Sequence, residues 1–177
     1  MVYFLSGGCK NGKSMLAQHL CKKMAAGGPM YYVATMIPGD EEDHARIRKH
    51  IADREGWGFT TLEQGRNLPA CLDRADPEGT FLLDSVTALL GNEMFSPDGF
   101  DPNCGERVYE DLKSFIGRVK NAVLVSDFIY SDAERYDEWT ELYRRALARA
   151  DRAALYCDCV IEVCLGQTIV HKGVLDL

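Results

Sequence analysis

The stretch FLSGGCKNGKS, residues 4–14, restricts the possible folds of this chain more than any other. An apolar run breaks into glycines, and a Gly-Lys-Ser triplet follows before helical spacing begins. The pattern G-x-x-x-x-G-K-[ST] between a strand and a helix is typical of a phosphate-binding loop, whose backbone N–H groups point at an anion. The sequence therefore predicts a nucleotide site that includes Gly7, Gly8, Cys9, Lys10, Asn11, Gly12, Lys13 and Ser14.

Two side chains of this loop have specific expected roles. Lys13 is expected to reach the β and γ phosphates of a nucleotide, and Ser14 to hold Mg²⁺. A second carboxylate for the metal is expected at Asp84, because the apolar run TFLLDS ends in this acid. Asp127, which ends the run AVLVSD, is a weaker candidate for the same role.

Strand and helix patterns alternate along the chain. Short apolar runs predict strands at residues 2–6, 30–35, 80–85 and 122–127, with a shorter one at FTTLE, and the end of the chain predicts a hairpin turning at Gly166-Gln167. We expect one α/β domain over residues 1–177, a P-loop NTPase-like three-layer sandwich with a mostly parallel sheet and an antiparallel C-terminal hairpin.

Two connections carry local signals of their own. Residues 91–106, GNEMFSPDGFDPNCGE, are rich in Gly, Pro, Asn and Asp, which predicts a mobile loop. Ser131 and Glu134 have the spacing of a capping box, which predicts that a helix opens there.

Charge and cysteine content narrow the class of protein. The net charge of −7 predicts no nucleic-acid partner, and no apolar run has the length of a membrane span. Seven scattered cysteines and an N-terminus that resembles a strand favour reduced thiols and a cytoplasmic location. Cys157, Cys159 and Cys164 lack the paired spacing of a zinc site, so we interpret them as small apolar residues.

The segment DEEDHARIRKHIADREGW, residues 40–57, predicts a helix with little apolar content. Arg46, His50 and Asp53 share a face, and Arg54 lies one turn after His50. Such a face could perform phosphate chemistry, with Asp53 holding one ring nitrogen of His50 while the other attacks phosphorus. A solvated, salt-bridged surface explains the same spacing.

Several motifs together resemble the adenosylcobinamide kinase / adenosylcobinamide-phosphate guanylyltransferase family. They are GGCKNGKS, YYVAT, DEEDHARIRKH, FTTLE and FLLDSVTALLGN, whose order and spacing agree over residues 2–92. The resemblance implies a bifunctional enzyme of corrinoid salvage and cobalamin synthesis. Such an enzyme phosphorylates adenosylcobinamide with GTP or ATP, takes GMP from GTP onto a histidine, and passes it to the new phosphate.

The resemblance also implies residue roles. The family's guanylylated histidine lies in a helix of the form D-E-x-x-x-R-I-x-x-H, which Glu41, Glu42, Arg46, Ile47 and His50 match with one acid exchanged for another. His50 is thus the implied GMP carrier. The family's contacts to guanine and ribose map onto Ala34, Thr35, Met36, Arg54 and Glu63, with Asp84 near the metal. The family further implies a homo-oligomer, with a trimer as the expected form.

One segment departs from the family pattern. Where the family reads S/T-N-E-V-G, this chain reads SDFIYS over residues 126–131. The departure favours an alternative, in which a related P-loop kinase acts on another small hydroxylated substrate. A nucleotide-binding regulator without turnover is a third hypothesis, and the intact face around His50 argues against it.

Overall fold

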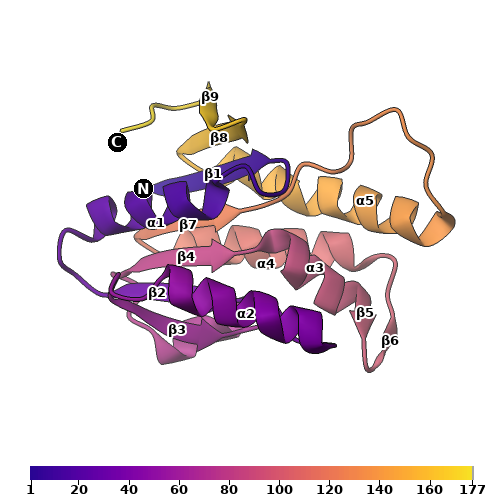
Figure 1. Cartoon of the computed structure of the whole chain (residues 1–177), viewed down its shortest axis with the longest axis horizontal. Coiled ribbons are helices and arrows are strands. Elements are labelled where there is room, and N and C mark those ends of the chain that lie inside the picture. The colour runs from indigo at the N-terminus through magenta and orange to yellow at the C-terminus, as the bar shows by residue number, and fades with distance from the viewer. Residues whose placement is uncertain (177) are drawn as a thin grey trace.

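A seven-stranded sheet forms the middle of the molecule in the computed structural model, which describes residues 1–176 (Figure 1). The strand order is β3-β2-β4-β7-β1-β8-β9, and every neighbouring pair is parallel except β8 and β9. This arrangement confirms the predicted fold class. The strands are β1 (Val2–Gly7), β2 (Met30–Ala34), β3 (Phe59–Glu63), β4 (Thr80–Asp84), β7 (Asn121–Val125), β8 (Cys159–Cys164) and β9 (Gln167–Lys172).

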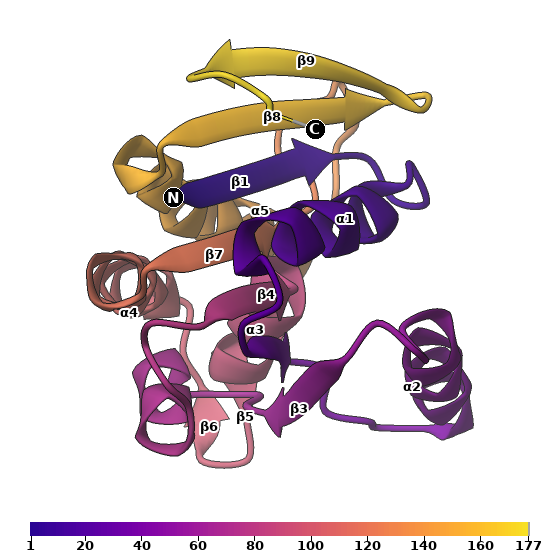
Figure 2. The ribbon, with the colours of Figure 1, turned by 90° about the vertical axis from the view of Figure 1, so that its left-hand side faces the viewer.

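Helices cover both faces of the sheet (Figure 2). One face carries α1 (Lys13–Ala25) and α2 (Glu41–Asp53). The other carries α3 (Val86–Met94), α4 (Cys104–Arg118), α5 (Glu138–Ala150) and the 3₁₀ helices η1 (Leu68–Arg74) and η2 (Asp151–Tyr156).

Alternation along the strands divides the core in two. In β1, Val2 and Phe4 pack with α3, α4 and α5, whereas Tyr3 and Leu5 pack with α1. Successive side chains of a strand point to opposite faces, so the two-sided burial explains the continuous apolar runs seen in the sequence. The same alternation assigns every polar residue near a strand end to one face.

Helix α2 differs from the other helices because it buries none of its side chains. Its ribbon lies on the α1 side and stands apart from the sheet (Figure 2). Local interactions stabilise it: the Asp40 side chain accepts from the N–H of Asp43 at the helix start, and Arg46 donates to Glu42 one turn away. Helix α2 is therefore stabilised by local polar contacts rather than by a packed core.

The prediction of a mobile loop over residues 91–106 is wrong. Helix α3 continues to Met94, a small hairpin of β5 (Phe95–Ser96) and β6 (Gly99–Phe100) follows, and α4 begins at Cys104. Pro97 and Asp98 form the turn of the hairpin, and Pro102 and Asn103 precede α4, whereas Gly91 and Asn92 lie within α3. The rings of Phe95 and Phe100 pair across the hairpin with centroids 5.5 Å apart.

The predicted capping box is also wrong. Helix α5 begins at Glu138, and its cap is Asp137, whose carboxylate accepts from the N–H groups of Trp139 and Thr140. Residues 131–137 form turns and irregular backbone before it. The C-terminal hairpin is confirmed, but its turn lies at residues 165–166, because Gln167 already belongs to β9.

Among residues 1–176, no helix is long and apolar enough to cross a membrane. The seven cysteines are all free thiols, and the described side chains form no cluster of three or more His, Cys, Asp or Glu residues suited to a metal.

Candidate active site

The predicted site residues gather at the carboxyl edge of the sheet. Ala34 is in register with Glu63 on one side and with Asp84 on the other. Asp84 in turn is in register with Val125 of β7, two residues before Asp127. Ligands of open parallel sheets bind at this edge, so strand order alone brings distant residues together.

The phosphate loop connects β1 to α1 as predicted. Gly7 has φ +139° beside β8, where a Cβ atom would lie 2.2 Å from the carbonyl oxygen of Val163. Gly12 caps α1 at φ +88°, a conformation that side chains rarely adopt. Glycine at both positions allows the loop to turn tightly and to present its N–H groups at the amino end of α1.

Lys13 is 5% exposed, and its ammonium meets three oxygen atoms. Nζ donates to the carbonyls of Gly7 at 3.0 Å and Gly8 at 2.5 Å, and it lies 2.9 Å from Asp127 Oδ1. An ammonium has three donors, so the protein's own oxygens satisfy all of them.

Asp84 lies between a buried phenol and the imidazole of His50. The hydroxyl of Tyr32 donates to Asp84 Oδ2 at 3.0 Å, and His50 Nδ1 lies 3.9 Å from the same oxygen. Burial and the neighbouring Asp84 carboxylate raise the pKa of Tyr32 above its usual range, so the phenol remains a donor. The structure thus brings two predicted residues, His50 and Asp84, together.

Arg54 fixes the end of α2 above the sheet. Its guanidinium stacks 3.9 Å from the centre of the Tyr32 ring and donates to the carbonyl of His50 at 2.8 Å. It also approaches Thr61 Oγ1 at 3.3 Å. This contact set links the backbone of His50 to strands β2 and β3.

The expectation that Asp53 holds the ring of His50 is wrong. Within residues 1–176, the carboxylate within 4.0 Å of a ring nitrogen of His50 is that of Asp84. Asp53 is exposed near the end of α2. Tertiary placement of α2 over the sheet decides the partner, which helical spacing alone does not show.

The residues of β2 and β3 that the resemblance assigns to nucleotide contacts lie at the same edge of the sheet. Their side chains differ in how exposed they are to a ligand. Thr35 is fully buried, and its hydroxyl bonds both the N–H and the carbonyl of Ser85, so its side chain has a structural task. Ala34 and Met36 are partly buried beside it. Glu63 is exposed at the end of β3, on the face that carries α2.

The residues present fit a magnesium ion. Both contacts of Asp84 described above involve Oδ2, which leaves Oδ1 for a cation. Ser14 follows Lys13 in the first turn of α1 and offers a hydroxyl oxygen. Mg²⁺ is usually held by one or two such groups together with substrate phosphates, so a larger cluster is not required.

Tyr32 is a site residue that the sequence interpretation missed. Strand alternation offered a signal, because Tyr32 and Ala34 share a face of β2, and Asp84 shares that face through the register. Thr61 was also missed. It lies two residues before Glu63 on β3, so strand alternation places the two side chains on the same face.

The segment that departs from the family pattern is anchored inside the fold. Ser126 donates to both carboxylate oxygens of Asp151 at 2.8 and 3.0 Å, and Tyr130 donates to Asp151 at 3.2 Å. Burial raises the pKa of Asp151 to about 7, although the two hydroxyl donors oppose that change. The carboxylate of this segment, that of Asp127, lies at the phosphate loop beside Lys13.

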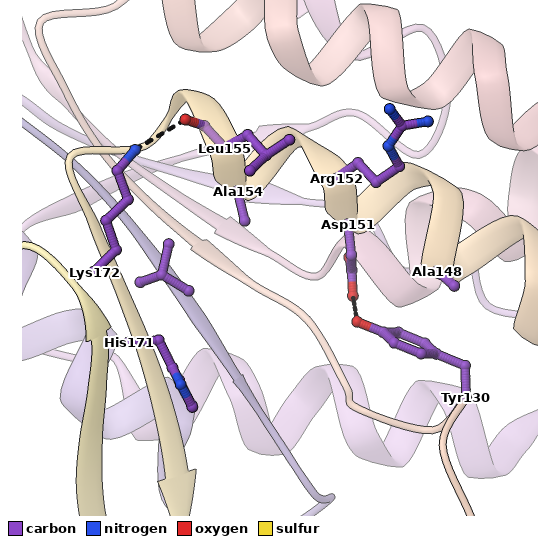
Figure 3. Close-up of a pocket in the computed structure, with 9 residues that line it drawn as sticks. Tyr130, Ala148, Asp151, Arg152, Ala154, Leu155, His171 and Lys172 are labelled. Carbon is purple, nitrogen blue, oxygen red and sulfur yellow. Dashed lines mark hydrogen bonds between the residues drawn. The ribbon is translucent and has the colours of Figure 1, made fainter.

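A cavity of 390 Å³ lies elsewhere, between η2 and the hairpin of β8 and β9 (Figure 3). Several of its polar groups have partners within the protein: Tyr130 binds Asp151, and Lys172 donates to the carbonyls of Leu155 and Cys157. None of its lining residues is a predicted site residue. The carboxyl edge therefore remains the candidate site.

Solved structures share this architecture at low sequence identity. One of them, the ATPase domain of another protein, aligns with a TM-score of 0.55 and 11% identity, covering 97% of this chain and 76% of its own. The flagellar accessory protein FlaH from Methanocaldococcus jannaschii aligns with a TM-score of 0.53 and 15% identity, covering 97% and 78%. These likenesses establish a P-loop NTPase-like fold. A comparison with curated proteins gave no match.

A family model provides the functional assignment. The model described as cobinamide kinase / cobinamide phosphate guanyltransferase matches residues 3–170, nearly the whole chain. The match includes the phosphate loop, the helix of His50 and the strand of Asp84. Members are bifunctional enzymes that use nucleotides in cobalamin biosynthesis. The chain belongs to the cobinamide kinase / cobinamide phosphate guanyltransferase family.

Proposed function

We propose that His50 carries GMP between the two substrates of the guanylyltransferase reaction. The observation that supports this role most directly is the position of its ring, with Nδ1 facing Asp84 at 3.9 Å on the face of the P-loop helix. A carboxylate beside Nδ1 favours the tautomer that carries its proton there, which leaves Nε2 with a free lone pair. Nε2 is then the nucleophile.

The guanylyl transfer has two balanced steps. First, His50 Nε2 attacks the α phosphorus of GTP, an N–P bond forms, the bond from the α phosphorus to the bridging oxygen breaks, and pyrophosphate leaves. Second, a phosphate oxygen of adenosylcobinamide phosphate attacks the same phosphorus and releases His50. Arg54, joined to the backbone of His50, is placed to offset charge that develops on the transferred group.

The phosphate loop supports both activities. Lys13 and the loop N–H groups hold the triphosphate, and in the kinase reaction the terminal phosphate passes to the hydroxyl of the corrinoid side arm. Mg²⁺, held by Ser14 and Asp84, would neutralise phosphate charge when bound. Tyr32 keeps Asp84 oriented through its hydrogen bond.

The test is intact-protein mass spectrometry after incubation with GTP and Mg²⁺. The wild type should gain one guanylyl group, labile to acid and stable to base as a phosphoramidate is, and His50→Ala should gain none. His44→Ala is the matched control, since His44 lies on the same exposed helix outside the family pattern. An adduct that persists in His50→Ala would remove the proposed role.

We also propose a homo-oligomer, with the trimer that the resemblance implies, in the cytoplasm. The outer strand β9 supports self-association, because all its side chains are exposed, including Ile169 and Val170. Free thiols at all seven cysteines suit a reducing compartment. Sedimentation equilibrium tests the assembly, and a monomer at micromolar concentration would contradict it.

A further inference from the structure

Asp127 lies at the carboxyl end of β7, the strand between the P-loop strand β1 and the Asp84 strand β4. Three backbone N–H groups fix its surroundings against β1, α3 and the phosphate loop. The N–H of Ser126 donates to Leu5, the N–H of Asp127 to the hydroxyl of Thr87, and the N–H of Phe128 to Gly7. The backbone of Asp127 is therefore fixed relative to the phosphate loop rather than carried on a free loop.

Its nearest charged neighbour is the ammonium of Lys13. Oδ1 lies 2.9 Å from Nζ, and the side chain of Asp127 retains 29% exposure while that of Lys13 retains 6%. Triphosphate oxygens must compete with Asp127 and with the Gly7 and Gly8 carbonyls for the same donors. If Nζ turns to the phosphates of a bound nucleotide, it releases the carboxylate oxygen of Asp127 at the phosphate loop.

The two carboxylates of the edge thus have different surroundings. Asp84 meets a neutral phenol and an imidazole, and it keeps an oxygen for a cation. Asp127 meets an ammonium, which repels a second cation at the same oxygen. Without a nucleotide, Asp84 is therefore the carboxylate with an oxygen available to a cation, whereas Asp127 is engaged with Lys13.

We propose that Asp127 is the general base of the kinase half-reaction, an inference that rests on the proposed function. In this step Asp127 takes the proton of the acceptor hydroxyl while the hydroxyl oxygen attacks the γ phosphorus. The new O–P bond forms, the bond from the γ phosphorus to the bridging oxygen breaks, and the nucleoside diphosphate leaves with that electron pair. The proton on Asp127 then passes to water.

The guanylyl transfer does not need this base. The attacking atom there is a ring nitrogen of His50 with a free lone pair, and the second acceptor is an ionised phosphate. Removing the carboxylate should therefore separate the two activities. Loss of a general base typically lowers the rate by about 10²- to 10⁴-fold.

The experiment compares Asp127→Asn with wild type in both half-reactions. Phosphorylation of adenosylcobinamide should show kcat lowered by about 10²- to 10⁴-fold, whereas formation of the GMP adduct should fall by less than about tenfold. Asp127→Glu should recover part of the kinase kcat because it retains a carboxylate. Asp98→Asn, at the 92% exposed tip of the hairpin, is the control for loss of one acidic group.

Each outcome decides the assignment. Parallel losses in both activities, or a changed nucleotide affinity with an unchanged kinase kcat, would leave Asp127 only as the counter-ion of Lys13 and overturn the proposal. A wild type that phosphorylates the corrinoid but forms no GMP adduct would instead contradict the role of His50. The two failures are therefore distinguishable.

Discussion

At the scale of single residues, the site is built from groups whose partners are already inside the protein. Lys13 is held by three oxygen atoms, and Asp84 is held by Tyr32 and faced by His50. Binding of a nucleotide must exchange some of these contacts for phosphate oxygens. Substituting a residue that makes one of these contacts therefore tests its role in nucleotide binding or catalysis.

Lys13→Ala should abolish both half-reactions, with losses of at least about 10²-fold, because one ammonium serves the triphosphate in each. Kinase turnover and the GMP adduct measure the two losses separately. Lys22→Ala is the matched control, because Lys22 is an exposed lysine in the last turn of α1, outside the predicted nucleotide site. Retention of one activity in Lys13→Ala would mean that the two reactions bind nucleotide in different places.

Tyr32→Phe should slow guanylyl transfer by about tenfold, the effect of one lost hydrogen bond to a charged group. The ring stays and still supports Arg54, so the fold should persist. Tyr31→Phe is the control: its hydroxyl accepts from the N–H of Asp76 away from the site. Equal rates in both variants would show that Asp84 needs no support from the phenol.

At the scale of elements, the sequence predicts the helices and strands well where apolar spacing and the P-loop decide them. It predicts helix boundaries poorly where several nearby polar residues could each serve as the cap. Ser131 and Glu134 have the spacing of a capping box, yet Asp137 caps α5, because its carboxylate accepts from the N–H groups of Trp139 and Thr140. The predicted partner of His50 was wrong because helical spacing shows only neighbours within α2. Asp84 comes close to His50 through the tertiary structure.

The cap of α5 can be tested by paired substitutions. Asp137→Ala should lower the melting temperature by about 2–4 °C, the usual effect of a lost cap in a chain of this size. Ser131→Ala should leave it unchanged, because Ser131 lies outside the helix. Thermal melts followed by circular dichroism give both values, and the reverse order would restore the capping box.

Helix α2 offers a second test at this scale. Arg54→Ala removes the stack on Tyr32 and the bond to the carbonyl of His50, so amide exchange in residues 41–53 should become faster. Arg48→Ala removes only an exposed pair with Glu41 and should change exchange much less. Hydrogen exchange with mass spectrometry compares the two, and identical protection would mean that Arg54 does not restrain the helix.

At the scale of the whole molecule, a buried acid makes stability depend on pH. The folded pKa of Asp151 is about 7, raised mainly by burial, whereas an unfolded aspartate has a pKa of about 4. Between these values the folded state keeps a proton that the unfolded state has lost. The contribution of this group to stability is therefore present below pH 4 and declines as pH rises to 7.

Asp151→Asn should remove that decline. Its free energy of unfolding, measured with denaturant at pH 5 and at pH 8, should fall less with pH than that of the wild type, by on the order of a few kcal/mol. The amide oxygen can still accept from Ser126 and Tyr130. Equal slopes would mean that Asp151 is ionised in the fold across this range.

The lack of buried side chains in α2 has a mechanical consequence. The contacts that join α2 to the sheet lie near its carboxyl end, at Arg54 and His50, so the helix resembles a lever with its pivot at that end. His50 lies about 6 Å from Arg54 along the axis, and the first residue of α2 about 20 Å. A swing of about 10° therefore moves His50 by about 1 Å, enough to close its gap to Asp84, and sweeps the free end through about 3 Å. Small rotations about the carboxyl end thus adjust the distance from the imidazole to Asp84 while moving the amino end of the helix about three times as far.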